Sequence, residues 1–233
     1  MNQVTEIRPG VFAIEDGSVR MYLICGKTSA LLLDTGFGSA GAMEAVKTLY
    51  TGPVQLAHTH AHFDHVGGDR AFSRVFAHPA EWPDIIQQTG IAEEALSPLK
   101  EGDVFDLGGR SITVIETPGH TKGSLSFLDK QNRLFFTGDN VSDATVYICL
   151  PGADLDEYEK SLRRILAMQG QYDTLLGCHG QIELSVGQAQ RMLDCVAAIR
   201  DGRAASERCN AYDDFWFDKR SWQGASIFLP LTQ

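Results

Sequence analysis

The chain has 233 residues, of which 43% are hydrophobic and 21% are charged, a composition that fits one large globular domain or two small ones. Its formal net charge is -10, and it has no run of Lys or Arg, so nucleic acid is not expected as a partner. Apolar runs stay far below the roughly 20 residues that span a bilayer, and no signal peptide is visible. We therefore expect a cytoplasmic protein that does not bind membranes.

The first half of the chain has the pattern of short strands with two helices among them. Apolar residues from Met43 to Tyr50 recur at helical spacing and predict a helix over 39–50. A shorter helix is expected at 80–90. Apolar runs punctuated by Gly and Asp, which are typical of strands, occur at 10–17, 20–26, 29–36, 53–60 and 73–78.

The second half repeats this organisation. Asp154 is a suitable N-cap and Gly170 a suitable stop, so a helix is predicted over 154–170, with another over 185–202. Two strands are expected within 102–119, and others at 124–129, 133–139 and 172–180. Two strand-rich halves without a linker predict two packed sheets with helices outside, in a single domain over 1–233. A C-terminal helix and an aromatic tail would follow from about residue 181.

Four of the seven histidines lie in the stretch LAHTHAHFDHVGG, residues 56–68. His60 and His62 are two residues apart in a loop that leaves a predicted strand, so both imidazoles can face one point. Asp64 and His65 follow directly and can face a second point. Imidazole is a good zinc ligand, and a carboxylate also accepts iron or manganese. His58 has no matching role and is expected to pack or to support the others.

Further polar residues follow other predicted strands, each within two positions of a glycine. A strand end that runs into a loop is where a rigid scaffold presents functional side chains. These residues are Asp34, His120, Asp139 and His179. By contrast, Cys178 is expected to be a buried, inert thiol whose side chain points away from the site. His78 is given only a small chance of reaching the site, and Lys122 is as easily a solvated residue as a substrate contact.

The ordered set His60-x-His62-x-Asp64-His65, then His120, Asp139 and His179, with Asp34 upstream, resembles the metallo-β-lactamase-fold hydrolase superfamily. The resemblance covers residues from about Val4 to Gly180. It implies an α/β fold, a four-layer αββα sandwich of two mixed sheets, with two divalent metal ions at one edge. Zinc is the first choice for these ions, and iron or manganese are alternatives.

The resemblance also assigns a role to each residue. His60, His62 and His120 would hold one metal, and Asp64, His65 and His179 the other. Asp139 would bridge the two ions, and Asp34 would support the metal-binding loop without touching a metal. A hydroxide shared by the two ions would attack an ester-like bond, with Asp64 and Asp139 as the catalytic carboxylates. We expect a small thioester, lactone or related ester as substrate.

Differences between this sequence and individual families of the superfamily restrict the expected substrate. True β-lactamases lack the bridging aspartate, so a β-lactam substrate is not expected. The ligand set is similar to those of glyoxalase II thioesterases and acyl-homoserine lactone lactonases. However, no basic helical domain for glutathione follows His179, and Ser142 stands where the lactonases have Tyr. Tyr147, further along the same loop, is the candidate substitute in substrate binding.

Two other classes stay open. Persulfide dioxygenases resemble the same superfamily and hold one iron with two histidines and an aspartate, which here would be His60, His120 and Asp139. A non-enzymatic metal or ligand sensor is the third class, although binding alone does not require a bridged pair.

Two further segments, 140–153 and the aromatic C-terminal tail, are expected to lie near the site, over the core or at a dimer contact. Segment 140–153 is expected to overhang the metals, with Tyr147, Ile148 and Leu150 as an apolar rim. The tail contains Phe215, Trp216, Phe217 and Trp222 and would either pack over the core or form a homodimer contact. Residues 225–230 would add an edge strand, within the chain or across a dimer.

Overall fold

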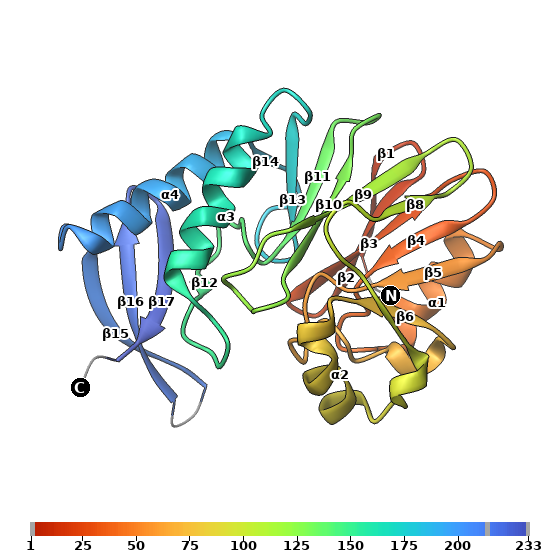
Figure 1. Cartoon of the computed structure of the whole chain (residues 1–233), viewed down its shortest axis with the longest axis horizontal. Helices are drawn as coiled ribbons and strands as arrows, with labels where there is room; N and C mark the ends of the chain where they lie inside the picture. Colours follow the sequence, from red (N-terminus) through yellow and green to blue (C-terminus); the bar gives the residue numbers. More distant parts are fainter. Residues whose placement is uncertain (1–2, 213–214, 232–233) are drawn as a thin grey trace.

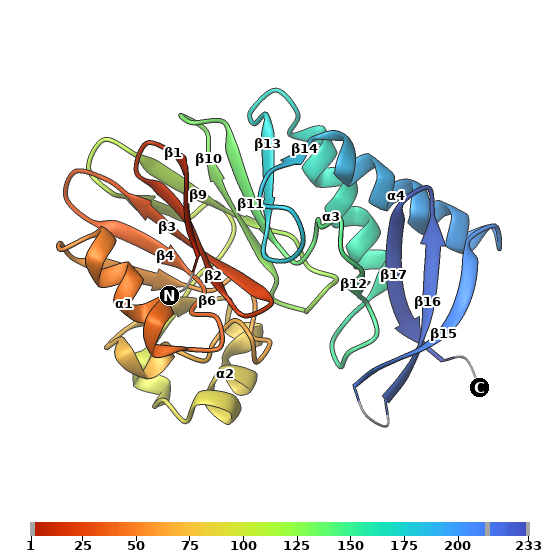
Figure 2. The same cartoon turned by 180° about the vertical axis from the view of Figure 1, so that it is seen from behind.

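The structure is a computed structural model, and it describes residues 3–212 and 215–231. Two large β-sheets lie face to face with helices on their outer sides, and a smaller third sheet lies beyond the last helix (Figures 1 and 2). Both large sheets contain parallel and antiparallel pairs. The expected αββα sandwich of two mixed sheets is therefore confirmed, and the third sheet is an addition to it.

The first sheet comes from the N-terminal half and has the order β1-β2-β3-β4-β5-β6-β7. Pairing is antiparallel from β1 to β4 and parallel from β4 to β7. The sequence pattern missed β1 and β7, which are short and lie at the two edges. The strands are β1 (Val4–Arg8), β2 (Val11–Asp16), β3 (Val19–Cys25), β4 (Ala30–Leu33), β5 (Val54–Ala57), β6 (Val75–Ala77) and β7 (Leu96–Pro98).

The second sheet has the order β14-β13-β11-β10-β9-β8. Only β11 and β13 pair in parallel, and they carry Asp139 and His179 just beyond their ends. The strands are β8 (Val104–Asp106), β9 (Ser111–Glu116), β10 (Leu125–Asp129), β11 (Leu134–Gly138), β13 (Thr174–Gly177) and β14 (Leu184–Ser185).

The helices begin and end close to their predicted bounds. They are α1 (Ala40–Leu49), α2 (Trp82–Thr89), α3 (Leu155–Ala167) and α4 (Gly187–Arg200), with 3₁₀ turns η1 (Asp69–Ala71), η2 (Pro79–Glu81) and η3 (Glu93–Ala95). Asp154 caps α3 as expected, because its carboxylate accepts hydrogen bonds from the Asp156 and Glu157 N–H groups. No helix among the described residues is long and apolar enough to cross a membrane.

The hydrophobic core has three layers because strand side chains alternate between the two faces of a sheet. In β3, Tyr22 and Ile24 face the second sheet, where they join a cluster that includes Phe127. Met21 and Leu23 face the other way, toward α1 and α2. The outer face of the second sheet packs against α3 and α4. Both faces of each large sheet are thus covered, which explains why many strands are apolar on both faces.

The aromatic tail forms the third sheet, whose order is β12-β17-β16-β15. Its strands are β12 (Val146–Tyr147), β15 (Ala205–Tyr212), β16 (Phe215–Trp222) and β17 (Ala225–Pro230). The prediction of an edge strand at 225–230 is wrong in position, because β17 lies between β12 and β16. Residues 213–214 of the predicted tail lie outside the described residues, and the single domain over 1–233 and the homodimer stay predictions.

We predict that Phe127→Ala lowers the free energy of unfolding by about 3–5 kcal/mol, the usual cost of deleting a buried aromatic side chain. Phe127 is fully buried between the two large sheets. The matched control is Phe215→Ala, because the Phe215 side chain is 68% exposed. Urea unfolding curves measure both variants, and equal losses would contradict the core described above.

Candidate metal centre

The predicted site residues meet at one edge of the sandwich. In each large sheet, the strands that precede them run in the same direction and end at that edge. Asp34 follows β4, the stretch from His58 to His65 follows β5, His120 follows β9, Asp139 follows β11 and His179 follows β13. Loops that leave strand ends therefore bring together residues that are up to 145 positions apart in sequence, from 34 to 179.

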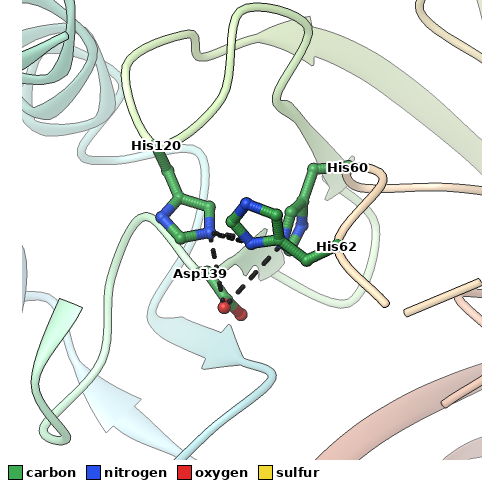
Figure 3. A group of neighbouring side chains, drawn as sticks. All are labelled: His60, His62, His120 and Asp139. Atoms are coloured by element: carbon green, nitrogen blue, oxygen red, sulfur yellow. Dashed lines mark hydrogen bonds and ion pairs between the residues drawn. The ribbon is translucent and has the colours of Figure 1, made fainter. Parts of the chain in front are cut away.

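The first cluster consists of His60, His62 and His120, with Asp139 beside them (Figure 3). The Nε2 atom of His120 lies 3.2 Å from Nε2 of His60 and 3.0 Å from Nδ1 of His62. The His60 Nε2 and His62 Nδ1 atoms are 3.0 Å apart. Three imidazole nitrogens thus converge on one point.

The hydrogen bonds behind these rings fix which nitrogens carry protons. The Thr59 hydroxyl donates to Asp34, so its oxygen can only accept from His60 Nδ1. His120 Nδ1 faces the Tyr147 carbonyl at 2.8 Å and must donate to it. In the neutral rings, the two Nε2 atoms that face each other therefore both present lone pairs. Such lone pairs repel unless a cation lies between them, so this donor set fits a metal ion.

The second cluster consists of Asp64, His65 and His179. The His179 Nε2 atom lies 3.4 Å from an Asp64 oxygen, and its Nδ1 donates to the Ser18 carbonyl. His65 Nδ1 is held by Asp34, while its Nε2 is buried without a hydrogen-bond partner among the described residues. A buried nitrogen left in this way is the second observation that fits a metal.

Asp139 lies between the two clusters. Its Oδ2 atom is 3.6 Å from His120 Nε2 and 3.3 Å from His179 Nε2. Its Oδ1 atom is buried, has no hydrogen-bond partner within 3–212 and 215–231, and lies 3.6 Å from His65 Nε2. This carboxylate can therefore contact an ion in either cluster. Gly138 makes the approach possible: its φ of +55° is unfavourable for other residues, and a Cβ there would lie 2.8 Å from Thr59 Cβ.

The pKa values separate the two clusters. Burial and the neighbouring His120 lower the pKa of His62 to about 3, and burial with the adjacent histidines holds the pKa of His60 well below its usual value. Both rings are thus neutral, the form that binds metal. Asp139 raises the pKa of His179 to about 10, despite partial burial. A metal ion in the second cluster must therefore displace a proton from His179.

Asp34 accepts hydrogen bonds from the loop that carries His60 and His65, a geometry that fits the supporting role implied by the resemblance. Its carboxylate is fully buried and accepts hydrogen bonds from the Thr59 N–H, the Thr59 hydroxyl and His65 Nδ1. Burial disfavours the charged form, but the histidines at 58 and 65 more than offset it and lower the pKa of Asp34. The residue has a φ of 64°, a strained conformation for a residue with a side chain.

His58 lies outside both clusters, in agreement with the sequence analysis. Its ring is buried between Asp34 and Asp69, with nitrogen-to-oxygen distances of 3.3 and 2.9 Å. Burial lowers the pKa of His58, but the two carboxylates raise it more, to about 9. His58 therefore donates from both nitrogens and links Asp69 to Asp34. The sequence analysis missed Asp69, although its acidic side chain directly follows the two glycines of the motif.

Cys178 completes a third group of potential ligands with Asp34 and His65. Its thiol lies 3.6 Å from an Asp34 oxygen, and burial raises its pKa to about 12. A thiol must lose its proton to bind a metal, so this group is better described as hydrogen-bonded support for Asp34. The expected burial agrees with this geometry. The expectation that the side chain points away from the site is wrong, because the thiol contacts Asp34 and lies within 4.8 Å of a His65 nitrogen.

A cavity of about 550 Å³ opens over the metal-ligand candidates. Segment 140–153 lines it, as expected, through Tyr147 and Leu150 among others. Ile148 is a correction: it is 3% exposed and belongs to the core outside the second sheet, because neighbouring residues of the extended chain point to opposite sides. On another wall lie Phe37 and Phe63, 43% and 56% exposed, with ring centroids 5.8 Å apart.

The two remaining candidates from the sequence, His78 and Lys122, lie outside both clusters. His78 caps the turn η2 and faces Glu116 at 3.7 Å, so it does not join a cluster. Lys122 is exposed and lines a second groove, which shares His62 and Leu150 with the main cavity. Phe228 of β17 also lines the main cavity, and no local pattern in the tail indicated this.

Comparisons with known proteins agree with this architecture. A family model described as "Metallo-beta-lactamase superfamily" matches residues 14–179. The acyl-coenzyme A thioesterase MBLAC2 of Homo sapiens is 28% identical, in an alignment covering 68% of this chain and 73% of that protein. The atrochrysone carboxyl ACP thioesterase dmxR1 of Cryptosporiopsis sp. (strain 8999) is 30% identical, in an alignment covering 57% of this chain and 41% of that protein.

A solved structure, "Metallo-beta-lactamase from Pontibacter korlensis", superposes with a TM-score of 0.72 at 21% identity, over 84% of this chain and 99% of that one. At this identity the likeness shows the fold alone. The chain belongs to the metallo-beta-lactamase superfamily, because the family model spans most of its length and most strands of both large sheets. The expected enzyme class, a hydrolase, is confirmed by this membership together with the relatives.

We predict that Zn²⁺ added to metal-stripped protein raises its melting temperature, because a ligand that binds only the folded state stabilises it by about 2.7 kcal/mol at one hundred times Kd. His120→Ala should reduce the shift, since it removes a converging nitrogen. His78→Ala is the matched control, a histidine outside both clusters. Equal shifts for the His120 variant and the unchanged protein would contradict the site.

Proposed function

We propose that this hydrolase cleaves thioesters at a dinuclear metal centre. His60, His62 and His120 would hold one divalent ion, Asp64, His65 and His179 the other, and Asp139 would contact both. The observation that carries this proposal is the position of Asp139 between two separate groups of converging nitrogens. Nitrogen and carboxylate donors at such a site favour zinc, with iron or manganese as alternatives.

Two independent observations support a thioester as substrate. Relatives aligned over more than half of this chain are named thioesterases, one for acyl-coenzyme A and one for an acyl carrier protein product. The cavity has apolar walls, with Phe37 and Phe63 on one of them and Phe228 also among its lining residues. We infer that the acyl part of a small-molecule substrate lies against these rings and presents its carbonyl to the metal ligands.

Metal ions bound at this centre would lower the pKa of a water molecule toward neutrality and polarise the thioester carbonyl. We infer that Asp64 accepts the proton of the attacking water; its position among the residues that line the cavity supports this role. Burial opposes its ionisation, but hydrogen bonding to His179 and the charge of His65 lower the pKa of Asp64. It is therefore an acceptor at neutral pH. A thiol, whose pKa is near 8.5, leaves readily as a thiolate.

The ring and backbone of Tyr147 contribute separately. Its carbonyl orients His120, while its ring lines the cavity and packs against Phe217 and Phe228, with centroids 6.3 and 4.8 Å away. We propose that this ring forms part of the substrate-binding wall. In this way, the third sheet supports a side chain at the centre of the site.

We predict that a chelator abolishes thioester hydrolysis and that Zn²⁺ restores it. Asp64→Asn should lower kcat by about 10²–10⁴-fold, the usual contribution of a proton acceptor or donor in catalysis. Rates on a panel of acyl thioesters, lactones and persulfides, with oxygen uptake recorded, would test this. Activity that survives complete metal removal would contradict the hydrolase mechanism, and oxygen uptake with one iron per chain would favour the dioxygenase alternative.

We predict that Phe63→Ala raises KM for thioesters with long apolar acyl groups by about 10-fold or more, since burying an aromatic ring against substrate stabilises the complex by about 1.5–3 kcal/mol. KM for a short acetyl thioester should change much less. Trp216→Ala, which removes an exposed aromatic ring from the third sheet, is the control. An equal effect on long and short substrates would remove Phe63 from the acyl-binding wall.

A further inference from the structure

Glu81 is a buried carboxylate that joins the two loops of the first cluster. It lies at the end of the turn η2 and is 3% exposed. Its Oε2 atom accepts a hydrogen bond of 2.8 Å from the Ala61 N–H, between His60 and His62. Its Oε1 atom accepts another of 2.8 Å from the Gly123 N–H, three residues after His120. One side chain thus fixes the backbone on both sides of the converging nitrogens.

The surrounding segment reinforces this connection. Gln88, in α2 (Figure 1), donates a hydrogen bond of 2.5 Å to the Ala61 carbonyl. Both the N–H and the C=O of Ala61 are therefore held by side chains from one short segment, residues 81–88. Burying a carboxylate costs several kcal/mol unless hydrogen bonds satisfy it. Each oxygen of Glu81 has a backbone donor, so the buried charge is compensated only while both loops stay in place.

Gly123 shows how closely the two loops approach. A Cβ at this position would lie 2.7 Å from Glu81 Cγ and 2.8 Å from its Oε1 atom. Those distances are below any normal contact, so only glycine lets the carboxylate reach this N–H. The small residue and the acid form a matched pair, although the sequence separates them by 42 positions.

We propose that Glu81 is a positioning residue for the first metal site. It would set the separation of the His60–His62 loop from the His120 loop, and hence the convergence of their ring nitrogens. The second cluster depends on other contacts, since Asp34 holds His65 and the Ser18 carbonyl holds His179. Loss of the Glu81 carboxylate should therefore weaken one metal site and leave the other unchanged.

Glu81→Gln tests this inference, because glutamine keeps the size of the side chain but turns an NH₂ group toward one of the two N–H donors. Zn²⁺ affinity is measured by competition with a chromophoric chelator in two backgrounds. His179→Ala removes a ligand of the second cluster, and His120→Ala removes one of the first. We expect Glu81→Gln to raise Kd by about 10–100-fold in the first background, as is usual for groups that support metal ligands, and to leave Kd unchanged in the second.

Controls separate positioning from general stability. Glu93→Gln changes an exposed acid of η3 and should leave both affinities unchanged. Gly123→Ala displaces the carboxylate without removing it and should reproduce the selective loss, which also covers the case in which Glu81→Gln does not fold. Equal losses at both sites, or a lower melting temperature of the metal-free protein with unchanged Zn²⁺ affinity, would overturn the inference.

The result is independent of the reaction proposed above, because Zn²⁺ affinity is measured without substrate. A chain that binds Zn²⁺ selectively through Glu81 but does not hydrolyse thioesters would contradict only the proposed function.

Discussion

The fully buried carboxylate of Asp34 is the interaction on which the arrangement of the site depends. It lies where β4 ends, and it binds the backbone and side chain of Thr59, the ring of His65 and the thiol of Cys178. These partners come from the loops after β5 and β13, one in each large sheet. An unpaired carboxylate at this depth would be very unfavourable. The hydrogen bonds to Asp34 therefore stabilise the arrangement in which the ends of β4, β5 and β13 lie close together.

The two clusters of candidate metal ligands are held by hydrogen bonds to different buried acids. Asp34 supports His65 of the second cluster directly and His60 of the first through the Thr59 hydroxyl. Glu81 holds the backbone of the loops that carry His60, His62 and His120. Both acids accept hydrogen bonds from the backbone of loops that carry candidate ligands. The Nε2 lone pairs of His60 and His120 face each other because the Thr59 hydroxyl and the Tyr147 carbonyl accept hydrogen bonds from the two Nδ1 atoms.

The third sheet links the tail to this centre. It pairs β17 with β12, whose Tyr147 both lines the cavity and holds His120 through its carbonyl. Phe217 and Phe228 pack behind the Tyr147 ring. The family model ends at residue 179, so β15, β16 and β17 of this sheet lie beyond the residues that it matches, whereas β12 lies within them. The tail thus packs against a residue of the cavity wall, whereas the candidate metal ligands come from loops of the two large sheets.

The sequence by itself determined the ligand candidates and the sandwich. His60, His62, Asp64 and His65 lie within one loop, and the other candidates follow apolar runs, so spacing and strand pattern identified the candidate positions. Their division into two metal sites came from the resemblance to the superfamily. Helix caps such as Asp154 were equally local. These features depend on neighbours in the chain, which a sequence displays directly.

Only the tertiary structure decided which side chains support and line the site. Glu81 and Phe228 act across long sequence separations, through hydrogen bonds or packing that no local pattern encodes. Ile148 and Tyr147 are adjacent and apolar, yet one is in the core and the other lines the cavity. The pairing of β12 with β17 sets their orientation. Composition cannot reveal such a choice, because it depends on the register between segments about eighty residues apart.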